Sequence, residues 1–182
     1  MKFTHFIAPA SLFLNSALAT GDASYFEQAI SYLSIGIQTA QEIADGTLPG
    51  IAMGLPVTVA YILLNDIEMS YDDIQNKTHS EITPSCRGVF NAFEKVVQLD
   101  TQLFPALSAL SCLPDMSSER SNLLLVLEVL WYAFKGFGDK FKEICPECKN
   151  ATETVEKYNF DALSSVLSAY STNCTTTTTT GQ

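Results

Sequence analysis

Five segments of this chain repeat apolar residues at steps of three and four, which is the spacing of one buried face on an α-helix. Proline, glycine or polar residues interrupt the pattern between the segments. No stretch of useful length alternates apolar and polar residues as a half-buried strand does. The sequence therefore predicts an all-α protein, an antiparallel bundle of about five amphipathic helices joined by short loops.

The interruptions set the expected ends of these helices. Proline is tolerated in a first helical turn, so the second helix is expected to start near Ile51 or Pro56. The predicted helices cover residues 22–44, 51 or 56 to 74, 87–110, 117 or 118 to 144, and 150–170. The side chains predicted to cap them are Asp22, Ser117 or Ser118, and Asn150 with Glu153 as a capping box.

Four local features carry further expectations. Pro105 lies inside the third predicted helix and is expected to kink it. Residues 123–132 are apolar almost all round, so the fourth helix is expected at the centre of the bundle. Residues 79–85 are expected to form a polar loop, and Asp66 is expected on a face away from the core.

The first 19 residues have the pattern of a secretory signal peptide. Lys2 supplies the positive start, residues 6–18 form an uncharged and mostly apolar run, and residues 17–19 give the small-x-small cleavage pattern. The alternative is a buried first helix. Pro9 and the short apolar length also argue against a membrane span, which needs about 20 residues.

The predicted organisation is a signal peptide over residues 1–19, a helical domain over 20–172 and a threonine-rich disordered tail over 173–182. Six threonines in a row resemble the start of an O-glycosylated stalk. No apolar stretch follows them, so neither a membrane span nor a glycolipid anchor signal is expected there. Three N-glycosylation sequons also favour a secreted protein of the extracellular space or cell wall: Asn76, Asn150 and Asn173.

Charge excludes some classes of function. The net charge is −10, and cleavage of the signal peptide would remove Lys2 and no acidic residue, which makes it −11. Nucleic-acid binding needs a basic surface and is not expected. The apolar share of 47% is too high for a disordered acidic tail.

Five cysteines should pair in an oxidising compartment, with one left over. Cys86 starts the third predicted helix and Cys145 and Cys148 end the fourth, and those ends meet if the two helices are antiparallel. Cys112 and Cys174 follow the third and fifth helices. The hypothesis is a Cys112–Cys174 bond together with Cys86 bonded to Cys145 or Cys148.

The Cys145–Cys148 segment has the Cys-x-x-Cys spacing of redox dithiols and zinc half-sites. The segment ends a helix in a chain without strand–helix alternation, which argues against a redox dithiol. A zinc site would need a second pair of cysteines at suitable spacing, which the sequence lacks, so a structural disulfide is favoured. His79 is the single histidine after residue 19, and no Gly-x-Ser-x-Gly motif is present. We therefore expect no enzyme, no catalytic residue, no cofactor and no metal site.

Aromatic and aliphatic residues crowd the third and fourth predicted helices. Pockets between the helices of a bundle are a recurrent type of ligand site. An ordinary filled core is the alternative. The candidate residues for an apolar cavity are Phe90, Phe93, Val97, Phe104, Leu127, Leu130, Trp131 and Phe134.

Three features of the sequence carry a resemblance to a known family. One is the order of a signal peptide, amphipathic helices and a Ser/Thr-rich tail. The others are the segments Val96–Leu110, with its internal proline, and Asp161–Tyr170. Together they resemble the fungal hydrophobic-surface-binding proteins, the family that includes the cell-wall galactomannoproteins. The resemblance covers about Asp22–Ser171. It implies a secreted helical bundle that coats hydrophobic surfaces or sits in the wall, and some members hold fatty acids in a central apolar cavity. The five cysteines and the strong acidic charge depart from the family's pattern.

Two hypotheses of function follow. The first is a secreted noncatalytic protein of the fungal wall or secretome that binds fatty acids, other lipids or hydrophobic surfaces. The alternative is a secreted effector or enzyme-inhibitor-like module that offers a helical face to another protein. Cell-wall polysaccharide and a host protein stay open as further partners.

Overall fold

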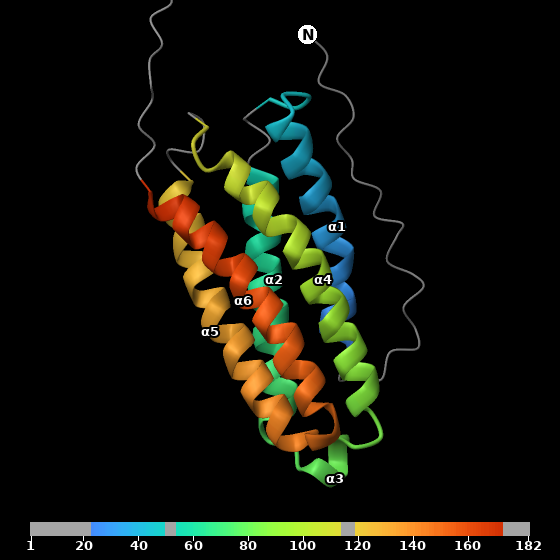
Figure 1. The fold of residues 1–182 in the computed structure, drawn as a ribbon. Coiled ribbons are helices and arrows are strands. Elements are labelled where there is room, and N and C mark those ends of the chain that lie inside the picture. Colours follow the sequence, from blue (N-terminus) through green and yellow to red (C-terminus); the bar gives the residue numbers. More distant parts are fainter. Residues whose placement is uncertain (1–22, 50–53, 114–118, 173–182) are drawn as a thin grey trace, which may run out of the picture.

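The computed structural model describes residues 23–49, 54–113 and 119–172. Five long helices make up the body of the protein (Figure 1): α1 Ser24–Ala44, α2 Gly54–Gln75, α4 Cys86–Leu110, α5 Arg120–Ile144 and α6 Lys149–Ser171. A one-turn helix, α3 His79–Ile82, and a 3-10 turn, η4 Pro146–Cys148, complete the described part of the chain, which contains no strand. The prediction of an all-α bundle is confirmed.

The five long helices form a closed ring in the order α1, α4, α6, α5, α2. Each packs mainly against its two ring neighbours. Consecutive long helices run in opposite directions along the bundle, so α1, α4 and α6 run one way and α2 and α5 the other (Figure 1). Helix α4 therefore lies between two helices that are parallel to it, and α2 lies parallel to α5.

The expected central position of α5 is wrong. Leu125 and Tyr132 are 60% and 72% exposed, whereas Leu127 and Leu130 are fully buried. In a closed ring every helix keeps an outer face, so apolar residues all round a helix do not place it on the axis. The outer face of α5 thus carries exposed apolar side chains.

Two helix starts also differ from the prediction. Helix α6 begins at Lys149 with Cys148 as its N-cap, so Asn150 lies inside the helix and the predicted capping box is wrong. The preceding 3-10 turn leads directly into α6. Helix α5 begins at Arg120, with Glu119 as its N-cap. The predicted caps Asp22, Ser117 and Ser118 lie outside the described residues. Helix α4 continues through Pro105 to its end at Leu110.

Residues 79–85 are not a simple polar loop, because α3 forms there. The backbone N–H of Thr78 donates to Glu81 Oε2 at 2.7 Å, which starts the turn. Ile82 is fully buried, and His79 Nδ1 lies 2.7 Å from the carbonyl oxygen of Ile144. Helix α3 therefore covers the end of the bundle where α5 finishes (Figure 1).

Disulfide bonding matches part of the cysteine hypothesis. Cys86 and Cys145 are bonded, which joins the start of α4 to the end of α5 across η4, and Cys148 is a free thiol. Cys112 is also disulfide-bonded, and its predicted partner, Cys174, lies outside the described residues. At the opposite end of the bundle, the Tyr170 hydroxyl donates to the carbonyl oxygen of Leu107 at 2.9 Å.

Candidate functional site

The predicted cavity residues lie mostly in the core. Phe90 and Trp131 are partly buried against the core, and the six fully or almost fully buried ones are Phe93, Val97, Phe104, Leu127, Leu130 and Phe134. All eight come from α4 and α5, which face each other across the ring because they are not ring neighbours. Burial of this kind suits a filled core as well as a lined cavity, so the cavity itself stays a prediction.

Aromatic rings fill one part of the interior. The ring of Phe26 from α1 lies 5.8 Å from Phe93 of α4 and 4.9 Å from Phe137 of α5, measured between centroids. Phe93 and Phe137 are 5.0 Å apart, and Phe93 also approaches Phe134 at 6.1 Å. Contacts of this length are typical of packed aromatic side chains. Helices α1, α4 and α5 thus meet directly across the axis at this level.

Three polar side chains share the interior with these apolar groups. Asp66 of α2, Asp100 of α4 and Asn159 of α6 are each at most 1% exposed. No hydrogen-bond partner reaches Asp66 Oδ2, either carboxyl oxygen of Asp100, or either side-chain polar atom of Asn159. The expectation that Asp66 lies away from the core is therefore wrong. Because most buried polar side-chain atoms are hydrogen-bonded, these atoms mark an unusual place in the core.

Burial changes the protonation of the two aspartates. Desolvation raises the pKa of Asp66 to about 6, with a small opposing effect from its hydrogen bond with Asn65. It raises the pKa of Asp100 well above the usual range. Burial therefore favours the neutral form of the Asp100 carboxyl, which can both donate and accept a hydrogen bond.

Asp100 and Asn159 lie at nearly the same level of the bundle. Val97 of α4 and Tyr158 of α6 line one groove between these parallel helices. Asp100 follows Val97 by three residues and Asn159 follows Tyr158 by one. At a rise of about 1.5 Å per residue, this reference puts their levels about 3 Å apart, and the Tyr170–Leu107 hydrogen bond between the same two helices puts them about 6 Å apart.

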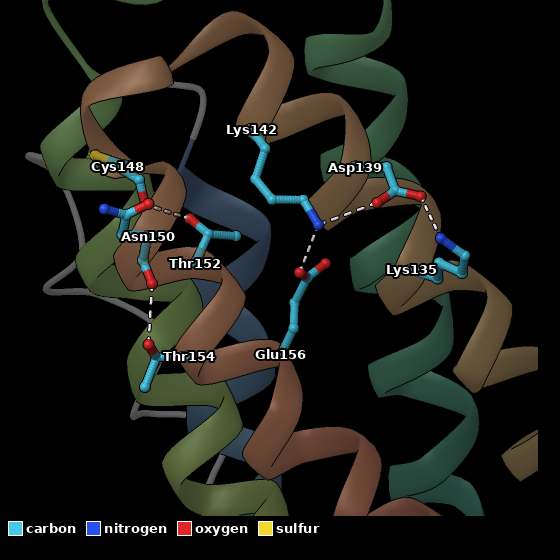
Figure 2. Close-up of polar contacts among 8 residues, drawn as sticks. All are labelled: Lys135, Asp139, Lys142, Cys148, Asn150, Thr152, Thr154 and Glu156. Atoms are coloured by element: carbon cyan, nitrogen blue, oxygen red, sulfur yellow. Dashed lines mark hydrogen bonds and ion pairs between the residues drawn. The ribbon is translucent and has the colours of Figure 1, made fainter.

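Glu156 of α6 is the fourth described side chain with a buried polar atom that lacks a partner, and it belongs to a different network (Figure 2). Its Oε2 accepts a hydrogen bond from Lys142 Nζ at 2.7 Å, and Lys142 also pairs with Asp139 Oδ1 at 3.0 Å. Desolvation raises the pKa of Glu156, and Lys142 opposes this shift. The other carboxyl oxygen, Oε1, has no partner and lies over Gly138. Because Gly138 has no side chain, the Glu156 carboxyl can lie against α5 while it binds Lys142.

The outer surface has open grooves between neighbouring helices. Among the predicted cavity residues, Val97 lines a groove between α4 and α6, and Trp131 lines one between α5 and α6. Tyr132 borders the second of these and also a groove between α2 and α5. None of these three grooves includes Asp66, Asp100 or Asn159 among its lining residues.

The remaining predicted sites occupy the surface or the ends of the bundle. Asn76 and Asn150 are exposed, as a glycan requires, while Asn173 lies outside the described residues. Cys86, Cys145 and Glu147 bring three potential metal-ligand atoms within 4.8 Å of one another. The two sulfurs are bonded as a disulfide and are not thiolate ligands. His79 contacts the main chain of α5 at the end of the bundle.

The site residues that the sequence analysis missed had a recognisable signal. Asp100 lies in the apolar series Val97, Phe104 and Leu107, all buried on α4. Asn159 likewise follows Val155 by four residues on the buried face of α6. A polar residue at an apolar position of a helical stripe is therefore the pattern that identifies them.

No family model and no curated protein matches this sequence. Solved structures do match. AfMP4p in complex with palmitic acid has a TM-score of 0.67 and 16% identity, over 82% of this chain and 97% of that one. This chain shares that fold. Ligand-binding domain 2 of the Penicillium marneffei MP1 protein, complexed with arachidonic acids, matches in two structures with a TM-score of 0.52 and 12% identity.

The two MP1 matches cover 85% of this chain and 99% and 97% of the domain. The TM-scores show the shared fold, whereas identities of 12% to 16% do not show a family, so the resemblance to the hydrophobic-surface-binding proteins stays a prediction. No helix in residues 23–49, 54–113 or 119–172 is long and apolar enough to cross a membrane.

Proposed function

We propose that this protein is a noncatalytic lipid-binding protein that holds a long acyl chain inside the ring of helices. The observation that carries the proposal is the fold, which is shared with three fungal structures that contain palmitic or arachidonic acid. The ring supports it because none of the described long helices occupies the axis, so the space between the five inner faces is filled by side chains alone.

The inner faces provide the chemistry for such a ligand. They are built mainly of Leu, Val, Ile and Phe from all five long helices. Burying each CH₂ group of an acyl chain contributes about 0.8 kcal/mol, against which stand the displacement of core side chains and the lost motion of the ligand. Binding therefore requires that some core side chains move aside as the ligand enters.

We also propose secretion, with glycosylation and residence in the extracellular space or fungal cell wall. The support is the signal-peptide pattern over residues 1–19 and the exposure of Asn76 and Asn150. Mass spectrometry of protein secreted by a fungal host, before and after N-glycan removal, tests both points. A secreted chain that keeps residues 1–19 or carries no glycan would contradict them.

Lipid binding is tested on the mature chain by native mass spectrometry and by displacement of a fluorescent fatty acid with palmitic acid. Two leucines of α5 form a matched pair, because Leu127 is fully buried and Leu125 is 60% exposed. Leu127→Trp is expected to weaken displacement by at least fivefold, and Leu125→Trp to leave it unchanged. Circular dichroism checks that both variants keep their helices. A wild-type chain that binds no fatty acid contradicts the proposal.

A second candidate function rests on the outer face of α5, where Leu125, Val129 and Tyr132 are exposed at successive turns. An exposed apolar stripe favours adsorption to a hydrophobic surface or docking of another protein. Leu125→Ser combined with Tyr132→Ser is expected to reduce adsorption to hydrophobic beads while fatty-acid displacement is unchanged. Unchanged adsorption would remove this candidate.

A further inference from the structure

We infer that Asp100 and Asn159 bind the polar head of the lipid inside the ring, and that this head is an uncharged hydrogen-bonding group. A protonated carboxyl and a hydroxyl both have this chemistry. The inference rests on the proposed lipid-binding function and specifies which lipids the site accepts.

The first support is the lack of hydrogen-bond partners for both side chains. Asp100 is 0% exposed and Asn159 is 1% exposed, and none of their four side-chain polar atoms has a partner. Leaving a buried donor or acceptor unpaired costs about 1–3 kcal/mol, so a ligand that pairs with these groups gains affinity from them. The two residues lie on adjacent helices within about 6 Å of each other's level, so a head group placed between them can pair with both.

The second support is the distribution of positive charge. Helices α1 and α2 contain no lysine or arginine, and Lys77 follows α2 at the end of the bundle covered by α3. The basic residues of α4 and α6 are all exposed: Arg87, Lys95, Lys149 and Lys157. On α5, Lys135 is exposed, Lys140 pairs with Glu143 and Lys142 pairs with Glu156.

Arg120, at the start of α5, donates to the main-chain oxygen of Ala169 at 3.2 Å, far from the level of Asp100. No described cation is therefore placed to pair with an ionised head group beside Asp100 and Asn159. An unpaired ion in the core costs several kcal/mol, whereas a neutral head does not. Asp66, when ionised, adds a negative charge on α2 and opposes an anionic head further.

The packing around Asp100 indicates the direction of the acyl chain. Aromatic rings around Phe93 and Phe137 fill the interior on one side of this level. On the other side, the buried residues of α4 are three leucines and one phenylalanine: Leu103, Phe104, Leu107 and Leu110. The ten residues from Asp100 to Leu110 span about 15 Å. A head bound at Asp100 thus directs the acyl chain into this more aliphatic half.

The test measures equilibrium binding of radiolabelled 1-hexadecanol and of its methyl ether, which cannot donate a hydrogen bond, to the mature chain. Asn159→Leu and Asp100→Leu are each expected to weaken 1-hexadecanol binding about tenfold and ether binding less than threefold. Asp100→Asn keeps a neutral donor and acceptor and is expected to stay within threefold of wild type. Asp161→Asn, at an exposed position of α6, is the control and should change neither affinity.

Wild-type protein alone supplies a measurement that does not depend on folding of a variant. Hexadecyl sulfate, which stays ionised, is expected to bind at least thirtyfold more weakly than 1-hexadecanol. Equal binding of these two lipids overturns the inference, as does an equal loss of both neutral lipids, or of neither, in the leucine variants. A wild-type chain that binds none of these lipids refutes the lipid-binding function itself, which is a different outcome.

Discussion

Gly138 makes the close approach of α5 to α6 possible, and Gly138→Ala is a direct test of that contact. A Cβ atom at this position would lie 1.7 Å from Glu156 Oε1 and 2.6 Å from Glu156 Cδ. The glutamate side chain therefore has to move. It is not free to do so at low cost, because it is buried and its other oxygen is bound to Lys142.

The magnitude follows from two opposing effects. Losing the charge-assisted hydrogen bond between Lys142 and Glu156 costs about 1.5–3 kcal/mol. Alanine returns about 0.8–1 kcal/mol through its higher helix propensity. The expected net loss in the free energy of unfolding is about 1–2 kcal/mol. Gly136→Ala is the matched control, since a Cβ atom there would meet nothing within 4 Å, and it should stabilise the protein by up to about 1 kcal/mol.

Urea denaturation of the two variants, followed by circular dichroism, measures both free energies of unfolding. In a Glu156→Ala background the obstacle is gone, so Gly138→Ala is expected to become neutral or stabilising. The coupling between the two positions should then be at least about 1 kcal/mol. If Gly138→Ala is as stable as Gly136→Ala, or if its cost persists without Glu156, the proposed contact does not limit this position.

The remaining predictions concern the disulfide, a buried acid and one buried hydroxyl. Replacing Cys86 and Cys145 by serine should lower the free energy of unfolding by about 4 kcal/mol, because the bond restricts the unfolded chain over a separation of 59 residues. A loss below about 1 kcal/mol would contradict this entropic explanation. The pKa of Asp66 is about 6 in the folded protein and near 3.8 in the unfolded chain. The contribution of Asp66 to the free energy of unfolding is therefore complete below pH 4 and is lost as the pH rises through 6, and this loss is at most about 3 kcal/mol. Denaturation at pH 4 to 7 should show a smaller decline for Asp66→Asn, and an unchanged decline would exclude this role. Tyr170→Phe removes the hydrogen bond to Leu107 and should lower the free energy of unfolding by about 1 kcal/mol in the same assay. An unchanged free energy of unfolding would mean that water in the unfolded chain binds the hydroxyl equally well.

Local patterns in the sequence predicted the helices well, because the period of apolar residues depends only on neighbours along the chain. The Cys86 pairing followed from the same information, since the end of α5 and the start of α4 lie at one end of any up-and-down bundle. Helix ends were less predictable. The turn from Pro146 to Cys148 started α6 before Asn150, where side-chain preferences alone had placed the start.

The arrangement of the helices was not predictable in the same way. An all-round apolar sequence such as residues 123–132 is compatible with a central helix and with a ring position that exposes Leu125 and Tyr132. Which occurs depends on the inner faces of the other four helices together. The burial of Asp100 and Asn159 was readable as a polar residue within an apolar stripe, but their lack of partners depends on the packing of other helices around them.

The ring order also bears on how fast the protein folds. Of the five main contacts between the described long helices, α1–α2 and α5–α6 join consecutive helices, while α1–α4, α4–α6 and α2–α5 join helices that are not consecutive. Tyr170 and Leu107 are 63 residues apart, and His79 and Ile144 are 65 apart. Closing such long loops before their contacts form slows folding. We therefore expect two fast helical hairpins and a later, slower step in which α4 closes the ring, so that this protein folds more slowly than a bundle of equal length in which every pair of consecutive helices is in contact.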